Sequence, residues 1–290
     1  MSTLTRARPL LGTLVEVRVE GLGETQARAA LDAAFAEVAT VHARMSFHDA
    51  ASDLSRLHVA EVGASVRVDF RTRDVLACAL HIAALSGGCF DPTIAARQVV
   101  LGALLRPAFG RAPDENATWR DIELLDDDRV RLRRPLWIDL GGIAKGYAVD
   151  RAIEVLVQAG ASHAVVNAGG DMRVAGQREE TVYLRGAARG GAAGAVSITD
   201  AALASSTGAV ARMRSGRRWV GAHIDGRSKM PIATFSSASV IAPACMVADA
   251  LTKVVLAASP SVSRRALAAC AAQAAMHSTR YGWRSVGAAA

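Results

Sequence analysis

Hydrophobic and polar positions alternate near the start of the chain and then change their period. Valines occupy every second position from 15 to 19 and are separated by charged residues, which is the two-residue period of a half-buried strand. Between residues 25 and 45 the apolar residues recur at helical spacing, which predicts a long amphipathic helix. The apolar face of this helix consists of Leu31, Phe35, Val38, Val41 and Met45.

The rest of the chain predicts a mixture of helices and strands. Periodicity and glycine stop signals predict further helices over 72–86, from the segment near 144 to Gly160, and over 246–258 and 262–276. Residues 102–118 are expected to be irregular, because prolines and glycines interrupt them. Alternation and turn residues predict strands over 121–138, 163–176 and much of 180–243.

Composition predicts a soluble globular protein. The chain has 290 residues, 51% of them hydrophobic, which is enough for a substantial core. Charges interrupt every apolar stretch before the roughly 18 residues that a membrane span needs, and the residues after Met1 do not resemble a signal peptide. The four cysteines lack metal-ligand spacing and are predicted to be buried free thiols, with a disulfide as the alternative. We therefore expect a cytoplasmic protein.

The positive charge has an unusual composition. The net charge is +7, but the basic residues are scattered and aromatic residues make up only 4% of the chain, so we do not expect a nucleic-acid partner. The chain contains 31 arginines and only three lysines: Lys145, Lys229 and Lys253. An ammonium group is compact and rotatable whereas a guanidinium is planar, so a lysine in such a chain indicates a site that needs the former.

One of these lysines lies in the segment WIDLGGIAKGYAVD, residues 137–150. The segment is expected to be a strand, a glycine turn and the start of a helix, an arrangement that directs free N–H groups and a helix dipole towards an anion. Lys145 would add a cation there, and Asp139 could accept hydrogen bonds from a ligand ring or ribose. The glycine spacing matches neither a dinucleotide-binding nor a Walker loop. A structural turn with a solvent-facing lysine is therefore the alternative.

Five further segments carry polar residues in patterns that suggest a site. They are RMSFHDAASDLSRLH (44–58), GGCFDPTIA (87–95), AGGDMRVAG (168–176), AHIDGRSKMP (222–231) and CMVADALTKVVLA (245–257). With PLLGTLVEV near the start and the 137–150 segment, they resemble, in order and over almost the whole chain, the blocks of the ApbE family of FAD:protein FMN transferases. Several ordered blocks make this resemblance specific.

The resemblance implies a fold and an activity. The fold is α+β, with antiparallel sheets flanked by helices in two packed lobes, and residues 1–290 would form a single domain. The activity is Mg²⁺-dependent transfer of FMN from FAD to a threonine or serine hydroxyl of a partner protein, with release of AMP. Phosphoryl transfer of this kind needs charge neutralisation, positioning and a base for the hydroxyl. FAD, Mg²⁺ and an acceptor protein are the expected partners.

The resemblance also implies roles for individual residues. Asp249, the carbonyl of Gly142 and the hydroxyl of Thr252 would bind Mg²⁺, which prefers hard oxygen ligands. Lys145, Asp139, Met45 and the pair Ser205 and Ser206 would contact the flavin nucleotide. His223 would orient or deprotonate the incoming hydroxyl, because a neutral imidazole can act as a base near pH 7, and Asp225 in the same loop is the second catalytic candidate.

The sequence departs from the family at two of these places. Family members commonly have threonine four residues after the metal-binding aspartate, whereas this chain has Lys253 there. A lysine at that position could pair with Asp249 and take the place of the metal. The loop after His223 is also one residue shorter between histidine and aspartate than in relatives. Two alternatives to transfer are therefore a non-catalytic FAD-binding protein and an FAD pyrophosphatase that yields FMN and AMP.

Overall fold

A computed structural model gives the fold of the chain. It describes residues 3–108, 110–185, 192–208, 212–215, 218–221, 223–232, 236–279 and 282–286. The described part is a mixture of helices and antiparallel sheets, so the predicted α+β class is confirmed. None of its helices is long and apolar enough to cross a bilayer.

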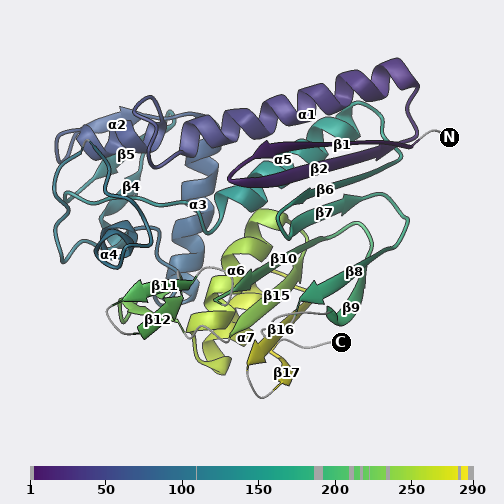
Figure 1. Cartoon of the computed structure of the whole chain (residues 1–290). Helices are drawn as coiled ribbons and strands as arrows, with labels where there is room; N and C mark the ends of the chain where they lie inside the picture. The colour runs from purple at the N-terminus through teal and green to yellow at the C-terminus, as the bar shows by residue number, and fades with distance from the viewer. Residues whose placement is uncertain are drawn as a thin grey trace.

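The central element is an eight-stranded antiparallel sheet (Figure 1). Its order is β1-β2-β6-β7-β10-β15-β16-β17, so strands from both ends of the chain meet in one sheet. The strand bounds are Thr3–Leu10 (β1), Thr13–Glu20 (β2), His163–Ala168 (β6), Asp171–Ala175 (β7), Ala202–Thr207 (β10), Ser237–Ala242 (β15), Ala274–Thr279 (β16) and Gly282–Ser285 (β17).

Three helices form a layer against this sheet. Helix α5 (Ala144–Gln158) packs on β6 and β7, and α6 (Cys245–Ala257) packs on β10 and β15. Helix α1 (Glu24–Met45) packs on α5, and all five residues of its predicted apolar face are buried. The apolar helix face predicted from the spacing is therefore part of the main hydrophobic core.

The other face of the sheet is covered by a hairpin. Strands β8 (Glu180–Arg185) and β9 (Ala192–Ile198) contribute Leu184 and Ile198 to a second hydrophobic cluster, which also contains Met172 and Val174 of β7. Side chains alternate between the two faces of a strand. Asp171 and Arg173 of β7 consequently lie on the face that carries α5 and α6, because Met172 and Val174 face the hairpin.

A smaller group of elements lies beside the sheet, to its left in Figure 1. It contains the three-stranded sheet β3-β5-β4 and short helices, and α3 (Phe70–Leu85) connects it to α6 and α7 (Pro260–Ala269). The remaining bounds of this group are Asp53–Val59 (α2), Ser65–Arg67 (β3), Ala95–Val100 (α4), Trp119–Asp121 (η1), Ile122–Leu124 (β4) and Arg129–Leu132 (β5). Two short hairpins complete the described fold, β11 (Arg212–Ser215) with β12 (Arg218–Gly221) and β13 (Ile224–Asp225) with β14 (Met230–Pro231).

Two predicted elements are wrong. The helix expected over 262–276 ends at Ala269, and Ala274 already belongs to β16. Ala271 adopts a positive φ of 52°, and the N–H of Ala272 donates to the carbonyl of Leu267 at 2.9 Å, so the helix closes without the glycine that usually marks its end. The strand expected to run to residue 138 ends at Leu132, and residues 135–140 are extended without sheet pairing.

Candidate active site

The 137–150 segment forms a tight turn before α5. The carboxylate of Asp139 accepts the N–H of Gly141 at 2.9 Å, and the N–H of Asp139 donates to the carbonyl of Pro92 at 2.8 Å. The second bond joins the segment to the 87–95 block. This contact takes the place of the sheet pairing that the sequence predicted. Helix α5 then begins at Ala144, so Lys145 lies in its first turn as expected.

Helices α5 and α6 meet at unusually short range. A Cβ on Gly146 of α5 would overlap the carbonyl of Cys245 at the start of α6, so only glycine fits there. One turn later, the carboxylate of Asp150 accepts the N–H groups of Cys245 and Met246, both at 2.8 Å, and it also pairs with Arg173 of β7 at 2.8 Å. Asp150, which the sequence reasoning did not single out, thus fixes α6 relative to α5 and the sheet.

This packing brings two lysine–aspartate pairs together. Lys145 of α5 forms an ion pair with Asp171 of β7, and Lys253 of α6 forms one with Asp249 one turn earlier on the same helix. The two carboxylates are 1% and 0% exposed. We call Lys145, Asp171, Asp249 and Lys253 the lysine–aspartate cluster. Asp171 was not among the predicted site residues, since its Gly-Gly-Asp segment favoured a structural turn near the nucleotide over a direct contact.

The pKa values show that the two pairs interact. Burial and the charge of Asp249 raise the pKa of Asp171 to about 6, against the opposing charges of Lys145 and Lys253. Burial acts to raise the pKa of Asp249 as well, but the charges of Lys253 and Lys145 outweigh it and lower that pKa. Burial acts to lower the pKa of Lys145, but Asp249 and Asp171 outweigh it and raise that pKa. The four groups are therefore one electrostatic unit.

The predicted hydroxyl residues divide between the two faces of the sheet. Ser206 is buried on the helix side, where its hydroxyl and that of Thr252 are 2.7 Å apart. Ser205 is exposed and pairs with Ser239 of β15 at 2.8 Å. Because neighbouring residues of a strand point in opposite directions, Ser205 cannot face the lysine–aspartate cluster with Ser206. Only Ser206 therefore faces the cluster, and the flavin contacts expected of the two serines stay predictions.

Two of the three predicted metal ligands, Asp249 and Thr252, have oxygens that other groups of the chain already engage. The ammonium of Lys253 is bonded to Oδ1 of Asp249, and the other carboxylate oxygen accepts the N–H of Gly146 at 3.4 Å. The Thr252 hydroxyl donates to the main-chain carbonyl of Asp249 at 2.6 Å. Within the described ranges, no group of three or more His, Cys, Asp or Glu side chains is arranged to hold a metal ion. These oxygens are already used, so they do not converge on an octahedral site.

His223 borders the cluster, whereas Asp225 serves its own loop. Burial and the charge of Lys253 lower the pKa of His223 to about 4, so its imidazole is neutral at pH 7. The carboxylate of Asp225 accepts the N–H of Arg227 at 3.1 Å and the hydroxyl of Ser228 at 2.7 Å. Asp225 therefore holds the turn after His223, and its catalytic role stays a prediction.

Met45 is 7% exposed and packs in the main core at the end of α1. Its predicted contact with a ring of the flavin nucleotide stays a prediction.

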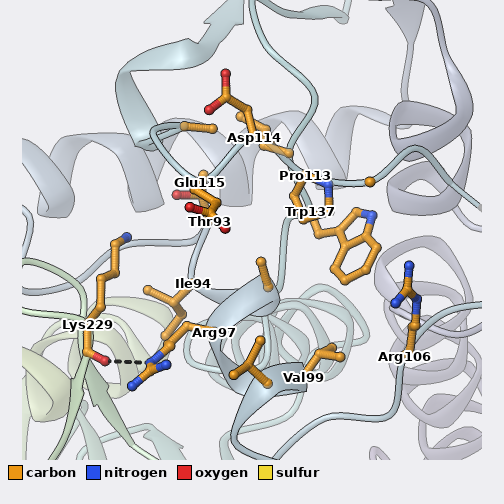
Figure 2. A pocket seen from close by; sticks show the side chains of 15 residues that line it. Thr93, Ile94, Arg97, Val99, Arg106, Pro113, Asp114, Glu115, Trp137 and Lys229 are labelled. Carbon is orange, nitrogen blue, oxygen red and sulfur yellow. Dashed lines mark hydrogen bonds between the residues drawn. The ribbon is translucent and has the colours of Figure 1, made fainter.

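A cavity of about 580 Å³ is lined by residues of the 137–150 segment, of α4 and of the loop after His223 (Figure 2). Its lining includes Trp137 of the 137–150 segment, Arg97 of α4 and Lys229 of the His223 loop. The Nε of Arg97 donates to the carbonyl of Lys229 at 3.0 Å, and the ammonium of Lys229 lies 3.4 Å from the buried carboxylate of Asp91. The cavity thus joins three of the blocks on which the resemblance rests.

The cavity combines an aromatic wall with positive charge. Trp137 is 4% exposed, its indole N–H has no partner in the described part of the chain, and the guanidinium of Arg106 lies 5.9 Å from its ring centre. Neither arginine was predicted as a site residue, because the irregular 102–118 segment and α4 show no motif. From the sequence, only Trp137 could have been linked to a site, because it lies within the 137–150 segment.

The sequence was compared with known protein families and proteins. The sequence model of the ApbE family matches residues 11–276. A Rhodobacter capsulatus protein named FAD:protein FMN transferase is 30% identical over 266 residues, which are 83% of this chain and 49% of that protein. A Treponema pallidum protein of the same name is 30% identical over 186 residues, 58% of this chain and 50% of that protein. The chain spans about half the length of these curated relatives.

Solved structures share the fold. The apo form of a Pseudomonas stutzeri flavinyl transferase ApbE superposes with a TM-score of 0.82 at 19% identity, covering 98% of this chain and 94% of that chain. An ApbE protein from Thermotoga maritima gives a TM-score of 0.83 at 22% identity, covering 98% and 97%. At these identities the likeness establishes the arrangement of elements.

Proposed function

The chain belongs to the ApbE family, and on that premise we propose that it is a transferase that moves FMN from FAD to a threonine or serine hydroxyl of a partner protein. The acceptor oxygen attacks the phosphorus on the FMN side of the pyrophosphate and forms a new P–O bond. The P–O bond to AMP breaks, and AMP leaves with its electron pair. The hydroxyl proton passes to a base. The observation that carries this proposal is the buried lysine–aspartate cluster beside a neutral histidine.

The first turn of α5 offers positive charge for a pyrophosphate. Lys145 lies in the first turn of α5, where the helix dipole adds to its charge. Phosphate groups favour such positions, because N–H donors and a cation converge on them. We therefore assign Lys145 to the phosphates of FAD, with Ser206 and Thr252 beside it and Asp139 shaping the turn. No step of this proposal passes through a metal ion, since the residues present do not fit one.

His223 is the proposed base. Its pKa of about 4 keeps the imidazole neutral at pH 7, so a ring nitrogen is available to accept the hydroxyl proton. The same low pKa makes it a weak base in the free protein. An anionic phosphate bound next to the ring would raise the pKa of His223. His223 would thus become a stronger base only when FAD is in place.

The cavity in Figure 2 is proposed to hold one ring system of FAD. Its volume of about 580 Å³ lies within the range of about 300–1,000 Å³ typical of ligand pockets. Trp137 offers an aromatic surface, and Arg97 and Lys229 offer positive charge. The hydrogen bond between Asp139 and Pro92 holds the cavity wall next to the start of α5.

One experiment tests the proposed function against its alternatives. The purified protein is incubated with FAD and a protein extract, and the products are followed as AMP by chromatography and as fluorescent flavin bands on a denaturing gel, with mass spectrometry of the labelled peptide. Transfer predicts equal amounts of AMP and of FMN bound to a threonine or serine. AMP with free FMN would identify a pyrophosphatase. FAD binding without AMP would identify a flavin-binding protein, the alternative that the pairing of Asp249 with Lys253 favours.

We also propose a cytoplasmic location and action as one domain over residues 1–290. Four cysteines without paired spacing support a reducing compartment. Cell fractionation with an antibody against the chain tests the location, and an exported or lipid-modified form would overturn it.

A further inference from the structure

Lys253 lies where the family resemblance led us to expect a metal ion. We propose that its ammonium group serves as a built-in cation beside the phosphates of FAD, so that FAD binding needs no divalent metal. This inference rests on the proposed function for the identity of the ligand. It deepens that function by stating which charge neutralises the phosphates.

The side chain of Lys253 lies among the groups that were expected to bind the metal. The ammonium donates to Oδ1 of Asp249 and to the main-chain carbonyl of the same residue, the latter at 3.1 Å. The Cε atom of Lys253 lies 3.4 Å from the point where a Cβ of Gly142 would stand. The lysine therefore extends from one expected metal ligand to the neighbourhood of another.

The oxygens left without partners are too few for Mg²⁺. Magnesium needs about six oxygens at roughly 2.1 Å in octahedral geometry, some of which can be water. Both oxygens of Asp249 and the hydroxyl of Thr252 already have partners. In the described part of the cluster, Oδ1 of Asp171 is the carboxylate oxygen without a partner, and Lys145 pairs with the other oxygen. A divalent ion would also be repelled by two ammonium groups.

The chain uses lysine selectively. All three lysines of the chain pair with aspartates that are at most 3% exposed: Asp171, Asp91 and Asp249. The chain otherwise uses arginine, 31 times. An ammonium has three N–H donors, and Lys253 uses two on Asp249. The third is left for a phosphate oxygen, and a planar guanidinium would not reproduce this arrangement of donors.

The test compares FAD binding with and without EDTA, followed by flavin fluorescence or calorimetry, in the parent and two variants. In the parent, we expect EDTA and added Mg²⁺ each to change the FAD dissociation constant by less than about twofold. In Lys253→Thr the carboxylate is released, so Mg²⁺ should tighten FAD binding by about tenfold and EDTA should reverse this gain. The control Lys253→Thr with Asp249→Asn lacks the carboxylate and should not respond to Mg²⁺.

Calorimetry of Mg²⁺ alone supplies a readout that does not depend on FAD. The parent should give no binding heat, whereas Lys253→Thr should bind the ion. Metal bound to the parent, or a loss of FAD affinity of about tenfold in EDTA, would overturn the inference. The parent measurements decide the question even if a variant does not fold. FAD binding that is insensitive to EDTA, without AMP release, would contradict only the proposed function. AMP release that requires Mg²⁺ would contradict only this inference.

Discussion

Two junctions between helices use opposite charges in different ways. At the first, the carboxylate of Glu37 in α1 accepts hydrogen bonds from Nε and Nη2 of Arg71 in α3, at 2.7 and 2.8 Å, and from Nε of Arg151 in α5 at 2.9 Å. At the second, the lysine–aspartate cluster joins α5, β7 and α6. The carboxylate of Glu37 is fully used by arginines. The cluster, by contrast, leaves a buried oxygen of Asp171 and one donor of Lys253 without partners in the described residues.

This difference indicates which junction serves the fold and which serves a ligand. A network in which every polar group has a partner holds its elements together and has no free group for a ligand. An unsaturated one carries the cost of buried polar atoms until a ligand completes it. The Glu37 junction should therefore respond to mutation in stability alone, and the cluster in both stability and FAD chemistry.

The largest effect is expected from Asp249→Asn, which leaves Lys253 buried without its counter-charge. Removing one partner of a buried pair costs about 3–5 kcal/mol, so the free energy of unfolding in urea should fall by that amount. AMP release should also be lost, because the phosphate site is distorted. Asp32→Asn is the control, since Asp32 is 55% exposed and pairs with Arg6 and Arg8 at the surface. Equal effects of both substitutions would remove the distinction between buried and surface pairs.

Acid should weaken the active-site side of the molecule before the Glu37 junction. His58 is 3% exposed and its Nε2 accepts the N–H of Ile138 at 2.8 Å, next to the 137–150 turn. Burial lowers the pKa of His58 to about 4, so the folded state resists protonation that the unfolded state accepts near pH 6.5. Stability is therefore complete above about pH 6.5 and decreases towards pH 4, by up to about 3 kcal/mol.

Arg71 and Arg151 lower the pKa of Glu37 although burial opposes them, so its ion pairs persist over this interval. Urea unfolding of the parent and of His58→Gln at pH 7 and pH 5 measures the difference. An unchanged pH dependence in the variant would show that another group is responsible.

A smaller loss is expected from Glu37→Gln, which breaks the charge pairing of two arginines at once. Glu37 is 12% exposed, so the loss should lie between that of a surface pair and a buried one, about 1–3 kcal/mol. FAD affinity should stay unchanged, as measured by fluorescence titration. Weaker FAD binding in this variant would contradict the division of roles between the two junctions.

The smallest effect concerns ligand selectivity. Lys145→Ala should weaken FAD by about tenfold and riboflavin much less, because the lysine is assigned to phosphate and riboflavin has none. Arg151→Ala, in the same helix, is the matched control and should affect neither ligand. Parallel fluorescence titrations with both flavins give the comparison. An equal loss for FAD and riboflavin would remove Lys145 from the phosphate site.

Local patterns predicted the elements that contain the site better than the site itself. The spacing of α1 and the glycine turn before α5 are properties of short windows, and both are confirmed. The pair of Asp249 and Lys253 was also foreseeable, since residues four apart share a helix face. The pair of Lys145 and Asp171 was not, because it joins a helix to a strand 26 residues away.

The errors have related physical causes. Ser205 and Ser206 were predicted as one contact, but strand alternation separates them, and β10 was not placed in register by the sequence. The helix expected to reach 276 stops at Ala269 because an alanine takes the left-handed conformation that usually requires glycine. The cavity at Trp137 depends on α4 and the His223 loop meeting in space, which no single segment encodes.

The close approach at Gly146 has a consequence for how this site can vary among descendants of the sequence. A glycine inside a helix lowers stability by about 1 kcal/mol relative to alanine, so drift favours replacement wherever space permits. Here the first added carbon would meet the Cys245 carbonyl and push α6 outwards, carrying Asp249 and Lys253 away from Lys145. The distance between the two lysine–aspartate pairs therefore depends on the absence of a side chain at Gly146. A single change from glycine to alanine would therefore disrupt the site without altering any of its charged residues.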